Sequence, residues 1–201
     1  MIKHWNVGIL LFNEVEVLDF AGPFEVFSIA SYPNCKQKPF TVNTVAQTTD
    51  LIIARNGLKV QPDYDFHNSP HFDILIVPGG YGAEEIEIQN QTLIKWIKDS
   101  TRDCDIIASV CTGAFLLAET GLLDGKRATT HWTDLDRLES EYSKIIVKRG
   151  IKFVDENDII TSGGISAGIN MSFYLLKRLV GEEIAFATAR RMEYDIDIHN
   201  M

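Results

Sequence analysis

A cysteine stands in the middle of this chain at the junction between an apolar strand and a helix. The segment Ile106–Ser109 is short and contains β-branched side chains, which is typical of a buried strand. The segment Thr112–Glu119 is rich in alanine and leucine, which is typical of a helix. The pattern changes at Cys111, and small neighbours such as Gly113 leave room for a sharp elbow. A buried strand that feeds directly into a helix is a unit of layered α/β folds.

Cys111 is the candidate nucleophile of the chain. The free N–H groups and the dipole at the start of the following helix favour thiolate over thiol. They are expected to move the pKa of Cys111 from about 8.5 toward neutrality or below. The alternative is a cysteine that packs inertly at the strand end, because unpaired cysteines are among the most buried residues.

Strand and helix patterns alternate along the whole chain. Short apolar runs typical of buried parallel strands are Val7–Phe12, Phe40–Ala46, Ile74–Val77, Ile106–Ser109 and Ile159–Thr161. Helical spacing or composition marks Leu18–Ser31, Leu93–Asp99, Thr112–Glu119, Leu135–Tyr142, Ala167–Val180 and Glu182–Met192. Residues 50–60 resemble a small hairpin or an excursion from the sheet. The alternation predicts one α/β domain over residues 1–201, a doubly wound, mostly parallel sheet flanked by helices as in a flavodoxin-like sandwich, with 191–201 as a C-terminal tail.

Composition and charge argue against several classes of protein. The chain has 28 acidic and 19 basic residues and a formal net charge of −9, which does not suit a protein that binds a phosphate backbone. No apolar run approaches the roughly 20 residues that a membrane span needs. Its three cysteines, Cys35, Cys104 and Cys111, cannot all pair and lack metal-type spacing. We therefore expect a cytoplasmic protein with no nucleic-acid or membrane partner.

Several conspicuous residues follow successive strands. In a doubly wound sheet the functional crevice lies beyond the carboxyl ends of the strands, so residues at those ends are expected to converge. The residues in question are Asp19, the pair Gly79-Gly80, Cys111 and the pair Gly163-Gly164.

Asp19 is the expected proton-transfer partner of Cys111. A carboxylate beside a thiolate is repulsive unless the two groups share one proton, so we expect a thiolate at Cys111 next to a protonated or proton-sharing Asp19. The alternative is that Asp19 only caps the helix that follows it, which is a common position for aspartate.

The Gly79-Gly80 pair is expected to place backbone N–H groups near the nucleophile as an oxyanion site, because only glycine lets a backbone approach so closely. A phosphate-binding turn is disfavoured, since the full glycine motif and a lysine are missing and Glu84 would repel phosphates. Thr112 adds an amide and a hydroxyl beside the sulfur and is expected to position water. The alternative is that Thr112 is an ordinary residue of the first turn of the helix.

Taken together, these motifs resemble those of the ThiJ/PfpI superfamily, the cysteine branch of the class I glutamine amidotransferase-like folds. The matching pieces are Leu11-Phe12, Leu18-Asp19-x-x-Gly22-Pro23, Val77-Pro78-Gly79-Gly80, Val110-Cys111-Thr112-Gly113, Ala128-Thr129-Thr130-His131-Trp132 and Thr161-Ser162-Gly163-Gly164. Within the superfamily the chain most resembles isonitrile hydratases and the sensor half of AraC-type regulators, which share the Cys-Thr-Gly and Thr-Thr-His-Trp pieces. Deglycase- and glyoxalase-like relatives carry Glu where Asp19 stands and usually Ala or His where Thr112 stands.

Many members of this superfamily keep a histidine near the pocket at the position of His131. A Cys–His dyad is conceivable, but no acid that would orient the imidazole is identifiable, so we expect His131 to line the pocket. Trp132 is expected to wall the pocket or to fill the core, and Gly163 and Gly164 to line it. The spacing of His67 and His71 permits a metal site, but without a third ligand nearby a loop role is expected.

The resemblance implies a homodimeric enzyme that uses no cofactor or metal and hydrates a small-molecule isonitrile, R–N≡C, to an N-substituted formamide. Cys111 would attack the terminal carbon, Asp19 would help to protonate it, and Asp19 and Thr112 would position the water that hydrolyses the thioimidate. Two alternatives stay open. One is a non-catalytic small-molecule or redox sensor like those of AraC-type regulators, and the other is a glyoxalase or stress-response protein of the same superfamily.

Overall fold

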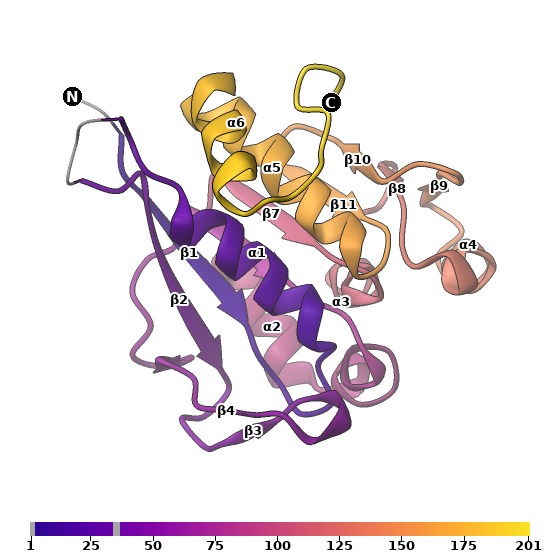
Figure 1. Ribbon diagram of the computed structural model, residues 1–201. Coiled ribbons are helices and arrows are strands. Elements are labelled where there is room, and N and C mark those ends of the chain that lie inside the picture. Colours follow the sequence, from indigo (N-terminus) through magenta and orange to yellow (C-terminus); the bar gives the residue numbers. More distant parts are fainter. Residues whose placement is uncertain (1–2, 34–36) are drawn as a thin grey trace.

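Seven strands form one central sheet in the computed structural model, which describes residues 3–33 and 37–201 (Figure 1). In spatial order they are β10 (Phe153–Asp155), β11 (Ile159–Ser162), β7 (Ile106–Ser109), β6 (Ile74–Val77), β1 (Trp5–Leu10), β2 (Phe40–Ala46) and β5 (Tyr64–Asp65). Every neighbouring pair is parallel except β10 and β11, which are antiparallel. The predicted mostly parallel sheet is confirmed.

Helices cover both faces of the sheet, as the strand-to-helix alternation predicts. In Figure 1, α1 (Val17–Ile29), α5 (Ser166–Val180) and α6 (Glu182–Arg191) lie in front of the strands, and α2 (Gln91–Ser100) and α3 (Gly113–Glu119) lie behind them. A smaller unit at one side holds α4 (Leu135–Glu141) and the parallel pair β8 (Arg127–Ala128) and β9 (Ile146–Val147). The chain is thus a helix–sheet–helix sandwich.

The boundaries of several elements differ slightly from the predicted ones. The first strand ends at Leu10 rather than Phe12, because its ladder with β2 runs from the Trp5–Phe40 pair to the Leu10–Val45 pair. The hairpin predicted within residues 50–60 is present as β3 (Ile52–Ile53) paired with β4 (Lys59–Val60). The described part of the chain also holds four short non-α helical turns: η1 (Arg55–Gly57), η2 (Gly82–Ile86), η3 (Glu87–Gln89) and η4 (Trp132–Asp134).

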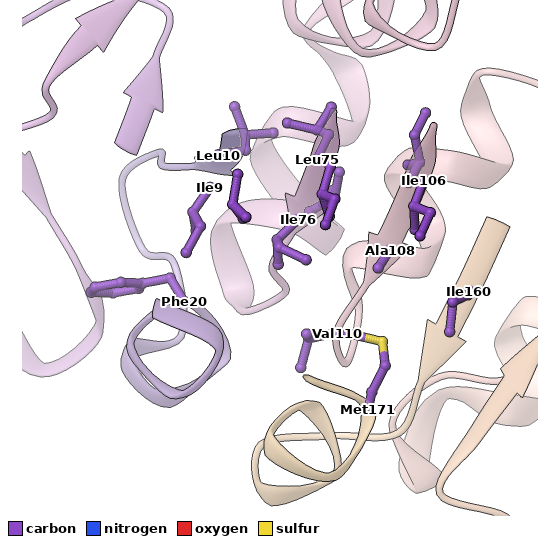
Figure 2. Close-up of a cluster of buried hydrophobic side chains, with 14 of the residues drawn as sticks. Ile9, Leu10, Phe20, Leu75, Ile76, Ile106, Ala108, Val110, Ile160 and Met171 are labelled. Carbon is purple, nitrogen blue, oxygen red and sulfur yellow. The ribbon is translucent and has the colours of Figure 1, made fainter. Parts of the chain in front are cut away.

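The core fills the space between the sheet and the helices. Figure 2 shows Ile9, Ile76 and Ala108, on three neighbouring strands, near Phe20 of α1 and Met171 of α5. All five side chains are buried. The strands read as continuous apolar runs because helices bury the sheet on both faces. No helix in residues 3–33 and 37–201 is long and apolar enough to cross a membrane.

The predicted C-terminal tail folds back onto the domain. Helix α6 ends at Arg191, and Ile198 beyond it is 1% exposed. The ammonium group of Lys177 on α5 donates to the carbonyls of Ile198 and His199 at 2.8 and 3.1 Å. The segment after Arg191 is therefore part of the packed domain.

The strand order places a crevice at the carboxyl ends of the central strands. From β1 the chain first adds β2 on one side and later β6 on the other, so the connections after β1 and β6 leave in opposite directions. Such a reversal opens a crevice in α/β sheets. Asp19 lies on the connection that leaves β1, and Gly79 lies on the one that leaves β6.

Candidate active site

Cys111 occupies a strained turn between β7 and α3. Its φ of 55° lies in the left-handed region that residues other than glycine rarely adopt. Gly113 permits the turn, since a Cβ there would lie 2.2 Å from the carbonyl oxygen of Val77. The Cys111 N–H donates to the Gly163 carbonyl at 3.2 Å, and the Thr130 hydroxyl donates to the Cys111 carbonyl at 2.8 Å. The sharp elbow predicted from the small residues is present, and its cysteine is 7% exposed.

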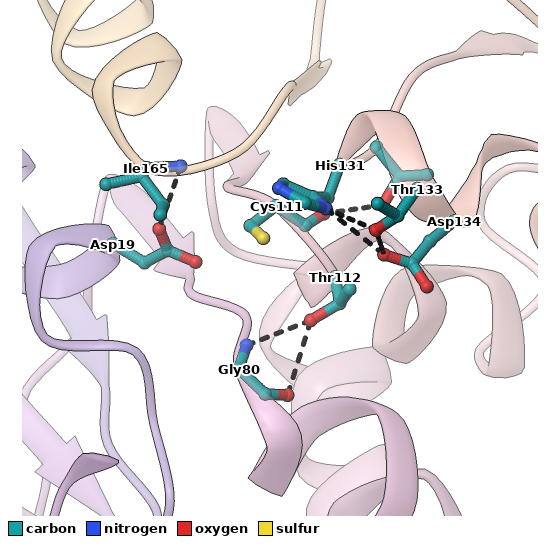
Figure 3. Close-up of polar contacts among 9 residues, drawn as sticks. Asp19, Gly80, Cys111, Thr112, His131, Thr133, Asp134 and Ile165 are labelled. Carbon is teal, nitrogen blue, oxygen red and sulfur yellow. Dashed lines mark hydrogen bonds and ion pairs between the residues drawn. The ribbon is translucent and has the colours of Figure 1, made fainter. Parts of the chain in front are cut away.

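Asp19 is buried beside the elbow and connects two segments distant in sequence. One carboxyl oxygen accepts the N–H of Gly79, and the other accepts the N–H of Ile165, each at 3.1 Å. Figure 3 shows the bond to Ile165. Glu16, rather than Asp19, is the N-cap of α1, and Asp19 lies inside the first turn. The capping alternative is therefore wrong, because the side chain points away from its own helix toward the crevice.

Burial raises the pKa of Asp19 from 3.8 to about 7, with a smaller contribution from the negative charge of Glu16. Hydrogen bonds from the Gly79 and Ile165 N–H groups and a side-chain hydrogen bond with Cys111 act in the opposite direction. The carboxyl group is thus balanced between its protonated and ionised forms near neutral pH. A group with such a pKa can both take and return a proton.

Burial and the negative charge of Asp19 raise the pKa of the Cys111 thiol, and the N–H of Thr112 only partly offsets them. The predicted lowering of this pKa is therefore wrong. A helix dipole is worth about 0.3–1 kcal/mol near a surface, whereas burying a thiolate beside a carboxylate costs more. The proton expected on Asp19 thus resides on sulfur in the resting pair, and Asp19 is the group of the two that ionises first.

The raised pKa of Asp19 makes the stability of the fold depend on pH. Below about pH 4 the carboxyl group of Asp19 is protonated in the folded and unfolded states alike. Its favourable contribution to the free energy of unfolding is present there and is lost as the pH rises through about 7. At 1.36 kcal/mol per pKa unit, this loss should amount to roughly 2–3 kcal/mol between pH 5 and pH 8. We expect Asp19→Asn to lack this loss. Denaturant unfolding of both proteins at the two pH values measures it, and a pH-independent difference between them would contradict the assignment.

Gly79 and Gly80 bring the loop after β6 against the elbow. A Cβ at Gly79 would lie 2.5 Å from the Thr112 nitrogen, and Gly80 has a φ of 114°, so larger residues do not fit at either position. Their amides, however, are engaged. The Gly79 N–H donates to Asp19, and the Gly80 N–H donates to the Thr112 hydroxyl at 2.9 Å. The predicted oxyanion site at Gly79 and Gly80 is therefore wrong, because a buried carboxyl and a buried hydroxyl already accept these two N–H groups.

Thr112 joins the elbow to this glycine loop. Its hydroxyl accepts the Gly80 N–H and donates to the Gly80 carbonyl, the latter at 3.3 Å. The residue precedes α3 instead of lying inside it, and it is 3% exposed. The Thr112 hydroxyl thus accepts from and donates to the backbone of the same residue, Gly80. Thr112 therefore stabilises the loop that presents Gly79 to Asp19.

His131 has an orienting acid that sequence analysis missed. Its Nδ1 lies 2.6 Å from the Thr133 hydroxyl and 3.3 Å from a carboxyl oxygen of Asp134, to which that hydroxyl donates at 2.8 Å. Figure 3 shows the hydrogen bonds that hold the His131 imidazole to Thr133 and Asp134. The sequence signal for this contact was that Asp134 follows His131 by three positions, a spacing that a single helical turn brings together.

The four predicted pocket residues, His131, Trp132, Gly163 and Gly164, all line one cavity of about 590 Å³. Gly164 lies against the imidazole, since a Cβ there would be 2.2 Å from Cδ2 of His131. Trp132 is 76% exposed, so the core alternative for this residue is wrong and it forms a wall of the cavity. The cavity adjoins the elbow through Gly163, whose carbonyl accepts the Cys111 N–H.

Comparison with known proteins identifies the family of this chain. The sequence matches the DJ-1/PfpI family over residues 6–178. The chain belongs to the DJ-1/PfpI family. Isonitrile hydratase from Pseudomonas putida is 36% identical over 189 residues, which cover 94% of this chain and 78% of that protein. The resemblance found in the sequence motifs is thus confirmed.

Other relatives of this DJ-1/PfpI chain differ in length and role. The HTH-type transcriptional regulator GbdR from Pseudomonas aeruginosa is 25% identical over 190 residues, covering 94% of this chain but 51% of the regulator. The chain therefore spans about half the length of GbdR. A solved structure of a ThiJ/PfpI family protein from Pseudomonas syringae superposes with a TM-score of 0.86 at 25% identity, covering 98% of this chain and 77% of the other.

Negative charge surrounds the thiol of this DJ-1/PfpI chain. Besides Asp19, the charges of Asp134 and Glu84 raise the pKa of Cys111. Burial and the charge of Asp134 also raise the pKa of Glu84 itself. The electrostatics of the site thus disfavour anionic ligands, in line with the weak case for phosphate binding in the sequence.

The remaining candidate side chains lie apart from the elbow. His71 contacts the carbonyl of Asp103 through Nε2 at 2.7 Å. Within the described ranges, no group of three or more His, Cys, Asp or Glu side chains is arranged to hold a metal ion. Burial raises the pKa of the Cys104 thiol to about 12, and Cys35 lies outside the described residues. Of the two cysteines that the structure describes, Cys111 is the one whose thiol lies beside Asp19.

Proposed function

We propose that this DJ-1/PfpI protein is an isonitrile hydratase that converts R–N≡C and water into an N-substituted formamide. One observation carries the proposal: the buried thiol of Cys111 lies beside a buried carboxyl, Asp19, whose pKa of about 7 lets it take and return a proton. The 36% identity to the isonitrile hydratase of Pseudomonas putida, over 94% of this chain, supports the same reaction.

The first half-reaction adds the thiol to the isonitrile carbon. Asp19 takes the proton of Cys111 as the sulfur attacks, and then gives this proton to the same carbon. The product is a thioimidate, Cys111–S–CH=N–R, and the carboxylate is regenerated. Because one proton circulates within the pair, the buried site gains no net charge. This suits a neutral substrate such as an isonitrile.

The second half-reaction releases the product. Water adds to the imidoyl carbon, the C–S bond breaks, and the sulfur recovers a proton as the formamide leaves. Throughout, the Gly79 and Ile165 N–H groups hold the two oxygens of Asp19 in place. Thr112 contributes by anchoring the glycine loop through Gly80.

Incubation of the purified protein with a simple alkyl isonitrile and, separately, with methylglyoxal tests the proposal. Formamide from the isonitrile is the expected product. Lactate from methylglyoxal as the only product would contradict the proposal and place the protein with the glyoxalase-like relatives. Absence of both products, together with saturable binding of a small ligand, would support a sensor.

The sensor alternative has one specific observation in its favour. The chain aligns over 94% of its length with the regulator GbdR, at 25% identity. In a sensor, Cys111 would contact a ligand or respond to oxidants, and turnover would be absent. Formamide production therefore distinguishes the two functions directly.

A further inference from the structure

We propose that His131, held by Thr133 and Asp134, is the base that activates water in the second half-reaction, while Asp19 serves the first. The inference rests on the proposed hydratase function and assigns the activation of water to a different group from the one that exchanges a proton with the Cys111 sulfur. His131 is then a catalytic residue, and Thr133 and Asp134 are positioning residues.

The hydrogen bonds around His131 determine which ring nitrogen is free. The Thr133 hydroxyl donates its proton to Asp134 at 2.8 Å, so its oxygen is left to accept a proton from Nδ1 of His131 at 2.6 Å. Nδ1 therefore carries the ring hydrogen, and Nε2 presents a lone pair. Within residues 3–33 and 37–201, Nε2 makes no hydrogen bond. An oriented imidazole with a free Nε2 is the arrangement that a general base requires.

The position of the ring suits an attack on an adduct of Cys111. Thr130 directly precedes His131, and its hydroxyl donates to the Cys111 carbonyl at 2.8 Å. This bond holds the backbone next to His131 against the elbow. The Cys111 N–H donates to the Gly163 carbonyl, and the next residue, Gly164, packs against the imidazole, so the ring and the elbow border the same Gly163-Gly164 segment. Gly164 packs against the ring, because a Cβ there would lie 2.2 Å from Cδ2 and 3.2 Å from Nε2, so the absence of a side chain at Gly164 lets the imidazole take this position.

Access of water distinguishes His131 from Asp19. Asp19 is 0% exposed, and each of its carboxyl oxygens already accepts a backbone N–H, from Gly79 and from Ile165. The His131 side chain is 26% exposed and lines the cavity of about 590 Å³. Water therefore reaches the imidoyl carbon from the side on which the imidazole stands.

One water molecule is consumed in the second half-reaction, and His131 and Asp19 each carry one proton. Nε2 of His131 takes a proton from water as the water oxygen bonds to carbon, and passes it to the substrate nitrogen, which gives Cys111–S–CH(OH)–NH–R. The hydroxyl proton then moves to Asp19 as the C=O bond forms and the C–S bond breaks. Asp19 returns this proton to sulfur. The formamide leaves with both groups restored.

His131→Asn tests the inference, because the asparagine amide can still donate to Thr133 but the Nε2 base is lost. With n-butyl isonitrile we expect turnover to fall about 100-fold while capture of the isonitrile continues. Intact-protein mass spectrometry should then show a Cys111 adduct with the mass of one added isonitrile. Asp134→Asn and Thr133→Val should accumulate the same adduct to a smaller extent, and Asp134→Asn provides the test if His131→Asn does not fold.

Two controls accompany the measurement. His67→Gln, at an exposed histidine far from the elbow in sequence, should behave as wild type, and Cys111→Ala should form no adduct. Turnover within about threefold of wild type without adduct would overturn the role of His131, and so would loss of both capture and turnover in folded His131→Asn. If the wild-type protein forms neither adduct nor formamide, the hydratase function itself is wrong.

Discussion

Cys111→Ala is expected to abolish formamide production, lowering turnover by about three orders of magnitude or more. The physical reason is that the sulfur forms the only covalent bond between the protein and the isonitrile carbon in the proposed reaction. Alanine cannot form it, and the neighbouring carboxyl remains without a proton to transfer. Rates of formamide release from an alkyl isonitrile, followed by chromatography, measure the effect.

Cys104→Ala is the matched control for this experiment. Cys104 is half-buried, and the pKa of its thiol is raised to about 12, so its removal should leave turnover near that of wild type. Circular dichroism of both variants checks folding, which matters at Cys111 because its φ is 55°. Substantial formamide production by folded Cys111→Ala would rule out covalent catalysis at this position.

Asp19→Asn is expected to lower turnover by about two orders of magnitude, since the amide can neither take the thiol proton nor return it to carbon. In the wild-type protein the ionised carboxylate is the active form. The pKa of about 7 therefore predicts that kcat/KM rises with pH and levels off above neutrality. The inflection should disappear in the variant. A pH–rate profile from about pH 5 to pH 9 measures both effects.

Glu16→Gln offers a conservative companion to that variant. The negative charge of Glu16 raises the pKa of Asp19, so its removal should shift the inflection to lower pH while retaining turnover. An inflection that stays in place would show that the titrating group is not Asp19. Near-normal turnover of folded Asp19→Asn would refute its role as the proton carrier.

Local patterns predicted the α/β class and the five inner strands of the sheet, but not its edge strands β5 and β10. The apolar runs at Phe40–Ala46, Ile74–Val77 and Ile106–Ser109 each form a strand with the predicted bounds. Such runs are recognisable because a parallel sheet covered on both faces needs an apolar side chain at nearly every strand position. The change of composition at Cys111 likewise marks the elbow, because only small residues fit so sharp a turn.

The convergence of Asp19, Gly79 and Cys111 also followed from sequence, since each comes after a strand and parallel strands end at one edge of the sheet. The tertiary structure alone decided which groups these residues contact and how they titrate. Asp19 takes the Gly79 N–H, burial outweighs the helix dipole at Cys111, and Asp134 orients His131. Hydrogen bonds between distant segments and the removal of water depend on the packed fold as a whole, so no local pattern encodes them.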